Sequence, residues 1–167
     1  MRTKLAVALA LIALPLFAVD YEYVAAWEAA QKRQPAHPPH TARIAPVNEP
    51  GTPLTIRGRV ADAAGHAIRD AVVFAYHTDA TGVYDRPGTP AHSWRLYGWA
   101  TTDARGTFVF ETIRPAPYPN RNVPAHVHFT VVRSNGQRYF ANDLEFEEGK
   151  AAPAADVTLK LDEKNRF

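Results

Sequence analysis

AHVHFTVVRS, residues 125–134, has the composition of a β-strand, because Val, Phe and Thr dominate it and polar and apolar residues partly alternate. Segments of the same kind recur between residues 52 and 162: TPLTIRGRVAD (52–62), AVVFAYHTD (71–79), LYGWATTD (96–103), GTFVFETI (106–113), QRYFANDLEF (137–146) and ADVTLKLD (155–162). Many short strands in succession predict an all-β fold, an antiparallel β-sandwich with long loops.

A four-residue motif separates several of these segments. It occurs as DAAG (62–65), DATG (79–82) and DARG (103–106). Asp favours a turn because its side chain bonds nearby backbone, and Gly tolerates the positive φ that a tight reversal needs. Such Asp residues could instead be ligands of a calcium ion, but no acidic residues follow at the spacing that a calcium site requires. We therefore predict three turns.

The region before the strands divides into three parts. Residues 1–18 resemble a signal peptide, since Arg2 and Lys4 precede an uncharged run from Leu5 to Val19. Residues 19–50 should hold one short helix, over residues 20–33, and a proline-rich linker. His37 and His40 should be solvated in this linker, with metal binding as the alternative. The β-sandwich domain should then occupy residues 51–167.

The signal peptide predicts export to the periplasm or the extracellular space. An uncleaved anchor is the alternative, and only then would the protein contact a membrane. Removing residues 1–18 leaves 17 basic and 17 acidic residues. Without a basic excess, nucleic acid is not an expected partner. The absence of cysteine excludes disulfides, thiolate metal sites and a cysteine nucleophile.

His126 and His128 project from one face of their strand, because side chains alternate along it. Such a pair alone is a weak metal signal. Two tyrosines precede it: Tyr118 in TIRPAPYPNRN (112–122) and Tyr84 in DATGVYD (79–85). A phenol becomes a good ligand only after losing its proton, which a hard trivalent cation favours. Zinc prefers nitrogen and sulfur. Two tyrosines and two histidines together therefore favour Fe(III) over zinc.

Three ordered runs, GRVADAAGHAIRDAVVFAYHTDATGVYD (58–85), GWATTDARGTFVFETIRPAPYP (98–119) and PAHVHF (124–129), resemble the intradiol ring-cleavage dioxygenases, especially protocatechuate 3,4-dioxygenase-like proteins. The resemblance implies a non-haem Fe(III) held by Tyr84, Tyr118, His126 and His128 with a solvent-derived hydroxide. It also implies that a catechol displaces Tyr118, which can accept its proton, and that O2 cleaves the ring between the hydroxylated carbons to a cis,cis-muconate-type product. A homo-oligomer is a possible assembly.

Two departures from this family lie beside the expected site. Val123 occupies the position where the family places an arginine that stabilises negative charge on the substrate, and Arg121 is the nearest candidate for that role, with an exposed loop charge as the alternative. Asn142 and Asp143 stand where the family often has glutamine, and a carboxylate there could alter which ring substituents are accepted.

Several other polar and aromatic residues have two possible structural roles. Residues 86–98 should form a long loop beside Tyr84, and four of its side chains could line a substrate mouth or simply pack: His92, Trp94, Arg95 and Tyr97. Of Tyr76 and His77, which precede the DATG turn, one is expected in the core.

Three alternatives to a catechol dioxygenase remain. GRVADAAGHAIRDAVV (58–73) also resembles the start of transthyretin-like modules, which have no catalytic metal and no use for two tyrosines and two histidines at one point. A cupin-like Fe(II) oxygenase would require a carboxylate or third histidine close behind His128, and none stands there. An iron-binding family member that lacks ring-cleaving activity is the third.

Overall fold

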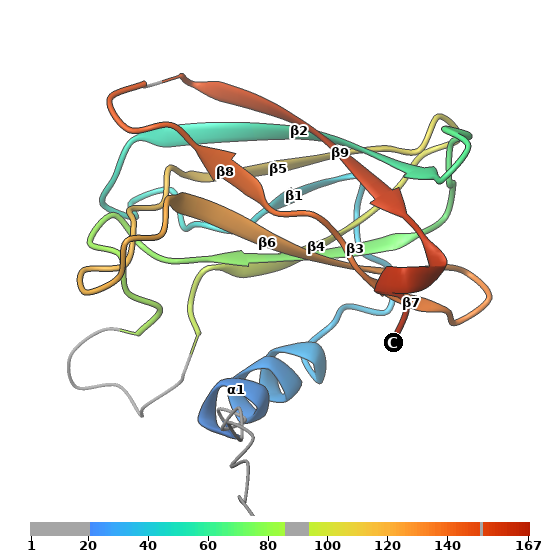
Figure 1. The fold of residues 1–167 in the computed structure, drawn as a ribbon, viewed down its shortest axis with the longest axis horizontal. Coiled ribbons are helices and arrows are strands. Elements are labelled where there is room, and N and C mark those ends of the chain that lie inside the picture. The colour runs from blue at the N-terminus through green and yellow to red at the C-terminus, as the bar shows by residue number, and fades with distance from the viewer. Residues whose placement is uncertain (1–20, 86–93, 151) are drawn as a thin grey trace, which may run out of the picture.

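Two β-sheets lie face to face in the computed structural model, which describes residues 21–85, 94–150 and 152–167 (Figure 1). Along these residues the elements are α1 (Tyr21–Gln31), β1 (Thr41–Arg43), β2 (Pro53–Asp62), β3 (Val72–His77), β4 (Tyr97–Thr101), β5 (Thr107–Ile113), β6 (Ala125–Val132), β7 (Arg138–Phe140), β8 (Leu144–Phe146), β9 (Ala154–Leu161) and a 3-10 turn, η1 (Glu163–Asn165).

The strand order within the described residues is β1-β5-β2-β9 in the first sheet and β4-β3-β6-β7 in the second, where β8 also pairs with β6. The pairs β2–β5, β3–β4, β3–β6, β6–β7 and β6–β8 are antiparallel. The pairs β1–β5 and β2–β9 are parallel. The predicted β-sandwich, preceded by a short helix, is confirmed.

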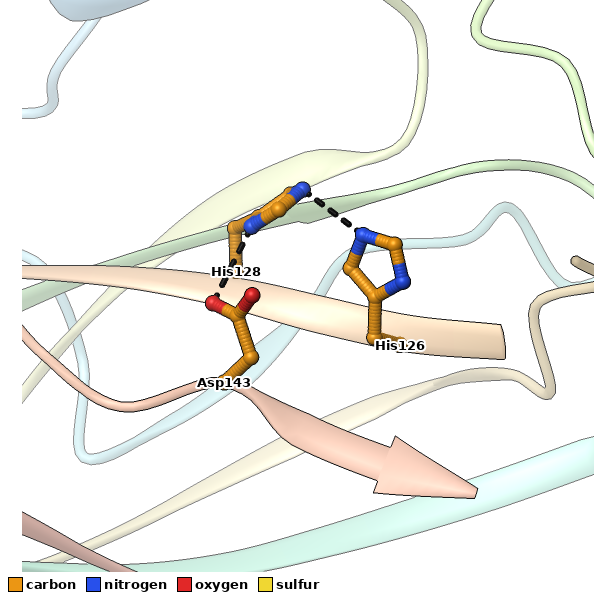
Figure 2. Close-up of side chains that lie close together, drawn as sticks. All are labelled: His126, His128 and Asp143. Carbon is orange, nitrogen blue, oxygen red and sulfur yellow. Dashed lines mark hydrogen bonds and ion pairs between the residues drawn. The ribbon is translucent and has the colours of Figure 1, made fainter. Parts of the chain in front are cut away.

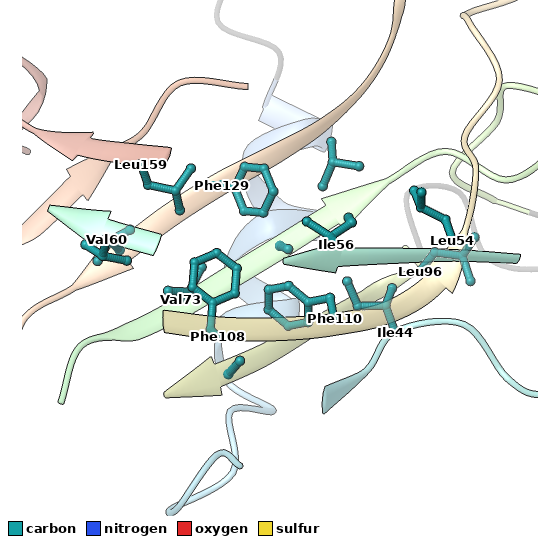
Figure 3. Close-up of a cluster of buried hydrophobic side chains, with 14 of the residues drawn as sticks. Ile44, Leu54, Ile56, Val60, Val73, Leu96, Phe108, Phe110, Phe129 and Leu159 are labelled. Carbon is teal, nitrogen blue, oxygen red and sulfur yellow. The ribbon is translucent and has the colours of Figure 1, made fainter. Parts of the chain in front are cut away.

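The core between the sheets is built from alternate positions of the strands (Figure 3). Ile56 and Val60 of β2 face Phe129 of the second sheet within one buried cluster. Gly58 continues the buried row of β2 without a side chain, because the ring of Phe108 crosses it: a Cβ added at Gly58 would lie 1.9 Å from Phe108 Cζ. The alternation that suggested strands is therefore the alternation of core and exterior.

Each of the three Asp-Gly motifs forms a turn. The glycine N–H donates to the carbonyl oxygen of the aspartate three residues earlier, over 2.9–3.1 Å. Gly82 illustrates the need for glycine, since its φ is +83° and a Cβ there would lie 2.1 Å from the Pro117 carbonyl oxygen. Hydrogen bonds from Thr107, followed by Arg105, lower the pKa of Asp103 to about 2.

Helix α1 covers the outer face of the second sheet (Figure 1). Ala26 and Ala30 are buried there against Phe74 of β3 and Trp99 of β4. The helix expected over residues 20–33 is thus confirmed at Tyr21–Gln31 and has a tertiary partner. The outer face of this sheet is consequently a second apolar layer, and it also carries His126 and His128 of the expected metal site.

Hydrogen bonds attach the segment after α1 to both sheets, although a linker was expected there. Residues 41–43, within the range expected to be linker, form β1 in parallel with β5. His37 and His40 are exposed, as expected, yet His40 Nδ1–H donates to the Thr101 carbonyl oxygen over 2.6 Å. The sandwich therefore begins about ten residues before the predicted boundary at residue 51, because β5 supplies the backbone partners of β1.

The predicted signal peptide, residues 1–18, lies outside the described residues, as does His92. Among the residues that are described, no helix has both the length and the apolar character needed to cross a membrane.

Candidate metal centre

Two adjoining loops present the tyrosines. The turn Asp79–Gly82 follows β3, and Asp79 N–H donates to the Val83 carbonyl oxygen over 2.8 Å, which sets the direction of the chain into Tyr84. Ala116 N–H donates to the Asp79 carbonyl oxygen over 3.1 Å, and this ties the loop that carries Tyr118 to the same turn. Tyr84 and Tyr118 are both half-buried.

The four expected ligand atoms converge on one point. Tyr84 Oη lies 2.7 Å from Tyr118 Oη. Tyr118 Oη is 3.2 Å from His126 Nε2 and 3.5 Å from His128 Nε2. The two Nε2 atoms are 2.9 Å apart (Figure 2). Two loops and strand β6 thus bring two phenol oxygens and two imidazole nitrogens together.

The hydrogen bonds of the two rings fix which nitrogen carries the proton. His126 Nδ1 lies 2.6 Å from the Pro124 carbonyl oxygen, which only accepts. His128 Nδ1 lies 3.0 Å from a carboxylate oxygen of Asp143, which when ionised also only accepts. In neutral rings both Nδ1 atoms are therefore protonated, and both Nε2 atoms present lone pairs. Two facing lone pairs at 2.9 Å repel unless a cation lies between them.

This donor set fits a metal ion. Metal–nitrogen and metal–oxygen bonds of about 2.0–2.2 Å place neighbouring donors about 3 Å apart, as these are. Among the His and acidic residues described, His126, His128 and Asp143 form a group whose possible ligand atoms lie within 4.8 Å of one another. Asp143 meets His128 at Nδ1, on the ring edge away from the tyrosines. The two tyrosines complete the set on the Nε2 side.

An aromatic stack supports the centre. The ring of Tyr76 stacks on that of His128 with centroids 4.7 Å apart. Trp94 stacks on Tyr76 at 4.4 Å and on Tyr84 at 5.4 Å. Trp94 is therefore a buried residue that packs against Tyr76 and Tyr84. Tyr76 and His77 are both buried, on opposite faces of β3, whereas the sequence suggested only one of them in the core.

Two other residues of the expected substrate mouth have partners elsewhere. Arg95 forms an ion pair with Glu49 at 3.1 Å and another with Asp79 at 3.4 Å. Tyr97 accepts a hydrogen bond from Arg33 over 2.9 Å and packs within the aromatic layer under α1. Arg95 thus braces the turn before Tyr84, and neither contact supports a role in lining the mouth.

A cleft of about 520 Å³ opens beside Tyr118, between its loop and β8. Its lining includes Arg121, Val123 and Glu145. Arg121 is exposed, with its guanidinium carbon 5.9 Å from the centroid of the Tyr118 ring. Val123 is 39% exposed and offers no charge. Among the cation–ring contacts of the described residues, that of Arg121 involves a predicted ligand, whereas Arg114, which lines the same cleft, lies over the ring of Phe146.

Similar proteins point in one direction. A family model described as dioxygenase matches residues 30–163. The protocatechuate 3,4-dioxygenase beta chain of Burkholderia cepacia is 32% identical over 111 residues, covering 56% of this chain and 46% of that protein. Catechol 1,2-dioxygenase of Acinetobacter guillouiae is 27% identical over 134 residues, covering 63% and 44%. The chain therefore spans about half the length of these curated relatives.

Solved structures agree on the fold. The dioxygenase domain of a dioxygenase carbohydrate-binding protein fusion from Streptomyces sp. SirexAA-E aligns with a TM-score of 0.59 at 24% identity, covering 77% of this chain and 91% of that one. The 3-chlorocatechol 1,2-dioxygenase of Rhodococcus opacus 1CP aligns with a TM-score of 0.57 at 22% identity, covering 81% and 77%.

Proposed function

The chain belongs to the intradiol ring-cleavage dioxygenase family, and on that premise we propose that it is a non-haem Fe(III) enzyme that cleaves a catechol between its two hydroxylated carbons. The substrates would be a catechol-type ring and O2, and the product a cis,cis-muconate-type diacid. The observation that carries the proposal is the convergence of two lone-pair-bearing imidazole nitrogens and two phenol oxygens at one point.

The proposed ligands are Tyr84, Tyr118, His126 and His128. Two phenol oxygens favour a hard trivalent ion, which promotes loss of their protons, over zinc, which favours nitrogen and sulfur. When bound here, a ferric ion would supply the electron-accepting centre that makes a catecholate reactive toward O2.

Among the four side chains, Tyr118 is the one placed to exchange with substrate. It lines the cleft and lies within 3.5 Å of a donor atom of each of the other three. Tyr84, in contrast, is held by its stacking on Trp94. As a phenolate, Tyr118 Oη can therefore accept a proton from an entering catechol hydroxyl and swing into the cleft, while Tyr84 stays in place.

Arg121 is proposed to act on the substrate. Its guanidinium is always charged and lies beside Tyr118 in the same cleft, where a fixed positive charge stabilises an anionic ring. The family position for such an arginine carries Val123, which favours a second candidate function, an iron-binding protein without ring-cleaving activity. Whether Arg121 acts on the substrate therefore distinguishes the ring-cleaving enzyme from the iron-binding protein without this activity. No other guanidinium in the described residues is in ring contact with Tyr118.

Oxygen uptake tests the proposal. The full chain, loaded with iron and given catechol under ¹⁸O2, should consume O2 and yield a ring-opened diacid that contains both labelled atoms. His126→Gln should abolish uptake, whereas His40→Gln, the same change at an exposed histidine outside the site, should not. Bound iron without uptake on any catechol would support the non-catalytic candidate instead.

Export and assembly are separate parts of the proposal. The apolar run that follows Arg2 and Lys4 supports a cleaved signal peptide and a location outside the cytoplasm. Expression of the full chain in a bacterium, followed by fractionation and N-terminal sequencing, should find protein that lacks about the first 18 residues in the periplasm. Size-exclusion chromatography with light scattering would test for a homo-oligomer.

A further inference from the structure

We propose that Asp143 is a positioning residue of the metal centre, which fixes the tautomer and orientation of His128 and makes it the more electron-rich of the two imidazole donors. This inference rests on the proposed function, since it assumes that His128 binds iron through Nε2. It assigns Asp143 a place outside the ligand set, although its carboxylate is near enough to both histidines to be taken for a ligand.

A β-bulge delivers Asp143 to this place. β6 pairs with β7 in a register that sets Thr130 opposite Phe140, and with β8 in a register that sets Val127 opposite Leu144. Between these points the two residues 128–129 of β6 face the three residues 141–143. One extra residue in a strand interrupts the ladder and redirects side chains, a device often found beside active sites.

The bulge gives the two polar residues within it different directions. Lys160 N–H donates to Asn142 Oδ1 over 3.4 Å, so Asn142 turns toward β9 of the other sheet. Asp143 turns toward β6, and Figure 2 shows its carboxylate beside the His128 ring at the start of β8. After the bulge Phe146 is again buried in the core. The inserted residue thus lets Asp143 reach the outer face while β8 keeps its apolar side inward.

His128 is held on two sides. Its ring face stacks on Tyr76, with planes inclined by 27°, and its Nδ1–H donates to Asp143 over 3.0 Å. The opposite ring edge, Nε2, is then directed at His126 and Tyr118. Because Asp143 occupies the Nδ1 edge, it orients the ring without competing for the position that Nε2 faces.

The two histidines differ in what accepts their Nδ1 protons. His126 donates to a neutral backbone carbonyl, that of Pro124, whereas His128 donates to a carboxylate. A carboxylate partner pulls the Nδ1 proton more strongly and increases the electron density at Nε2. A more basic donor stabilises Fe(III) relative to Fe(II). It should therefore lower the reduction potential and shift phenolate-to-iron charge transfer to shorter wavelength.

The test compares Asp143→Asn and Asp143→Ala in the full chain with Asp156→Asn as the matched control. Asp156 is an exposed carboxylate on β9 whose ion pair with Arg57 lies on the other sheet. Asp143→Asn keeps an oxygen acceptor and should retain iron, with a more positive reduction potential and a charge-transfer band at longer wavelength. Asp143→Ala should bind iron about 10–100-fold more weakly. Asp156→Asn should match the wild type in all three measurements.

A metal-free measurement separates this inference from the proposed function. Nitrogen-15 NMR of the apoprotein should find His128 as the Nδ1–H tautomer in the wild type and as a mixture in Asp143→Ala. If both Asp143 variants keep the wild-type His128 tautomer, reduction potential, charge-transfer band and iron affinity, the positioning role is wrong. Loss of iron from Asp143→Asn as complete as from His128→Gln would make Asp143 a ligand. A wild type that binds no iron would instead refute the proposed function, and this inference with it.

Discussion

Acidification from pH 7 to pH 5 is expected to destabilise the metal-free protein through His77. This side chain is 1% exposed and lies between the sheets, where its Nδ1–H donates to the Thr78 carbonyl oxygen and its Nε2 accepts from the Thr112 hydroxyl, each over 2.7 Å. Burial lowers the pKa of His77 to about 4. The ring is therefore neutral in the folded protein.

The size of this destabilisation follows from the difference in the pKa of His77 between the folded and the unfolded state. An unfolded histidine has a pKa of about 6.5, so the unfolded chain takes up a proton before the folded one does. The stabilisation is fully present above pH 6.5, falls as the pH drops below this value, and is lost once the pH has passed through 4. At about 1.4 kcal/mol per pH unit, the free energy of unfolding should fall by about 2 kcal/mol between pH 7 and pH 5. Asp62, Asp79 and Asp103 also have lowered pKa values, but carboxyl groups act mainly below this window.

Urea unfolding followed by tryptophan fluorescence measures the change. The wild type should lose about 2 kcal/mol more between pH 7 and pH 5 than His77→Gln, which cannot titrate in this range. Equal losses in the two proteins would refute the reasoning. If His77→Gln does not fold, NMR of the wild-type apoprotein decides: the His77 ring should not titrate above pH 5, and a midpoint near 6.5 would show that burial does not keep it neutral.

Three further substitutions test other parts of the structure. Gly58→Ala should lower the free energy of unfolding by about 1–3 kcal/mol, because its methyl group meets the Phe108 ring, and an unchanged urea midpoint would contradict this packing. Glu49→Gln should cost about 2 kcal/mol by weakening its ion pair with Arg95, and unaltered stability would show that the pair contributes little. Arg121→Ala should reduce kcat/KM for catechol at least about tenfold without changing iron content, and an unchanged kcat/KM would identify Arg121 as a solvated loop charge.

Local sequence signals were sufficient for most of the fold. The alternation in residues 52–62 and 106–113 became the buried and exposed faces of β2 and β5. The Asp-Gly motifs became turns because their hydrogen bonds involve only neighbouring residues. The strand β1 was missed, since its three residues follow a proline-rich segment and gain their hydrogen-bond partners from β5.

The candidate site was predictable as a set of residues and less so as an arrangement. Tyr84, Tyr118, His126 and His128 could be named from their motifs, and the structure brings their polar atoms within 3.5 Å of a neighbour in the set. The contact of Asp143 with His128 depends on one extra residue between β7 and β8, and QRYFANDLEF gave no sign that it would divide into two strands.

The partners of charged side chains were likewise not predictable from the sequence. Arg95 belongs to the segment expected as a loop after Tyr84 and was a candidate for the substrate mouth, yet it pairs with Glu49, 46 residues earlier in the chain. Ion pairs between distant segments depend on how the loops close over the sheets, which composition and periodicity do not report.

The visible absorption spectrum of the iron-loaded protein tests the central claim, that two tyrosines and two histidines bind ferric iron, most directly. Phenolate-to-Fe(III) charge transfer should colour the full chain red-brown to burgundy. Tyr84→Phe and Tyr118→Phe should each weaken the band, and the double variant should remove it, whereas Tyr139→Phe, at a tyrosine in the core, should leave it unchanged. A wild-type protein that stays colourless after iron reconstitution would contradict the assignment of all four ligands.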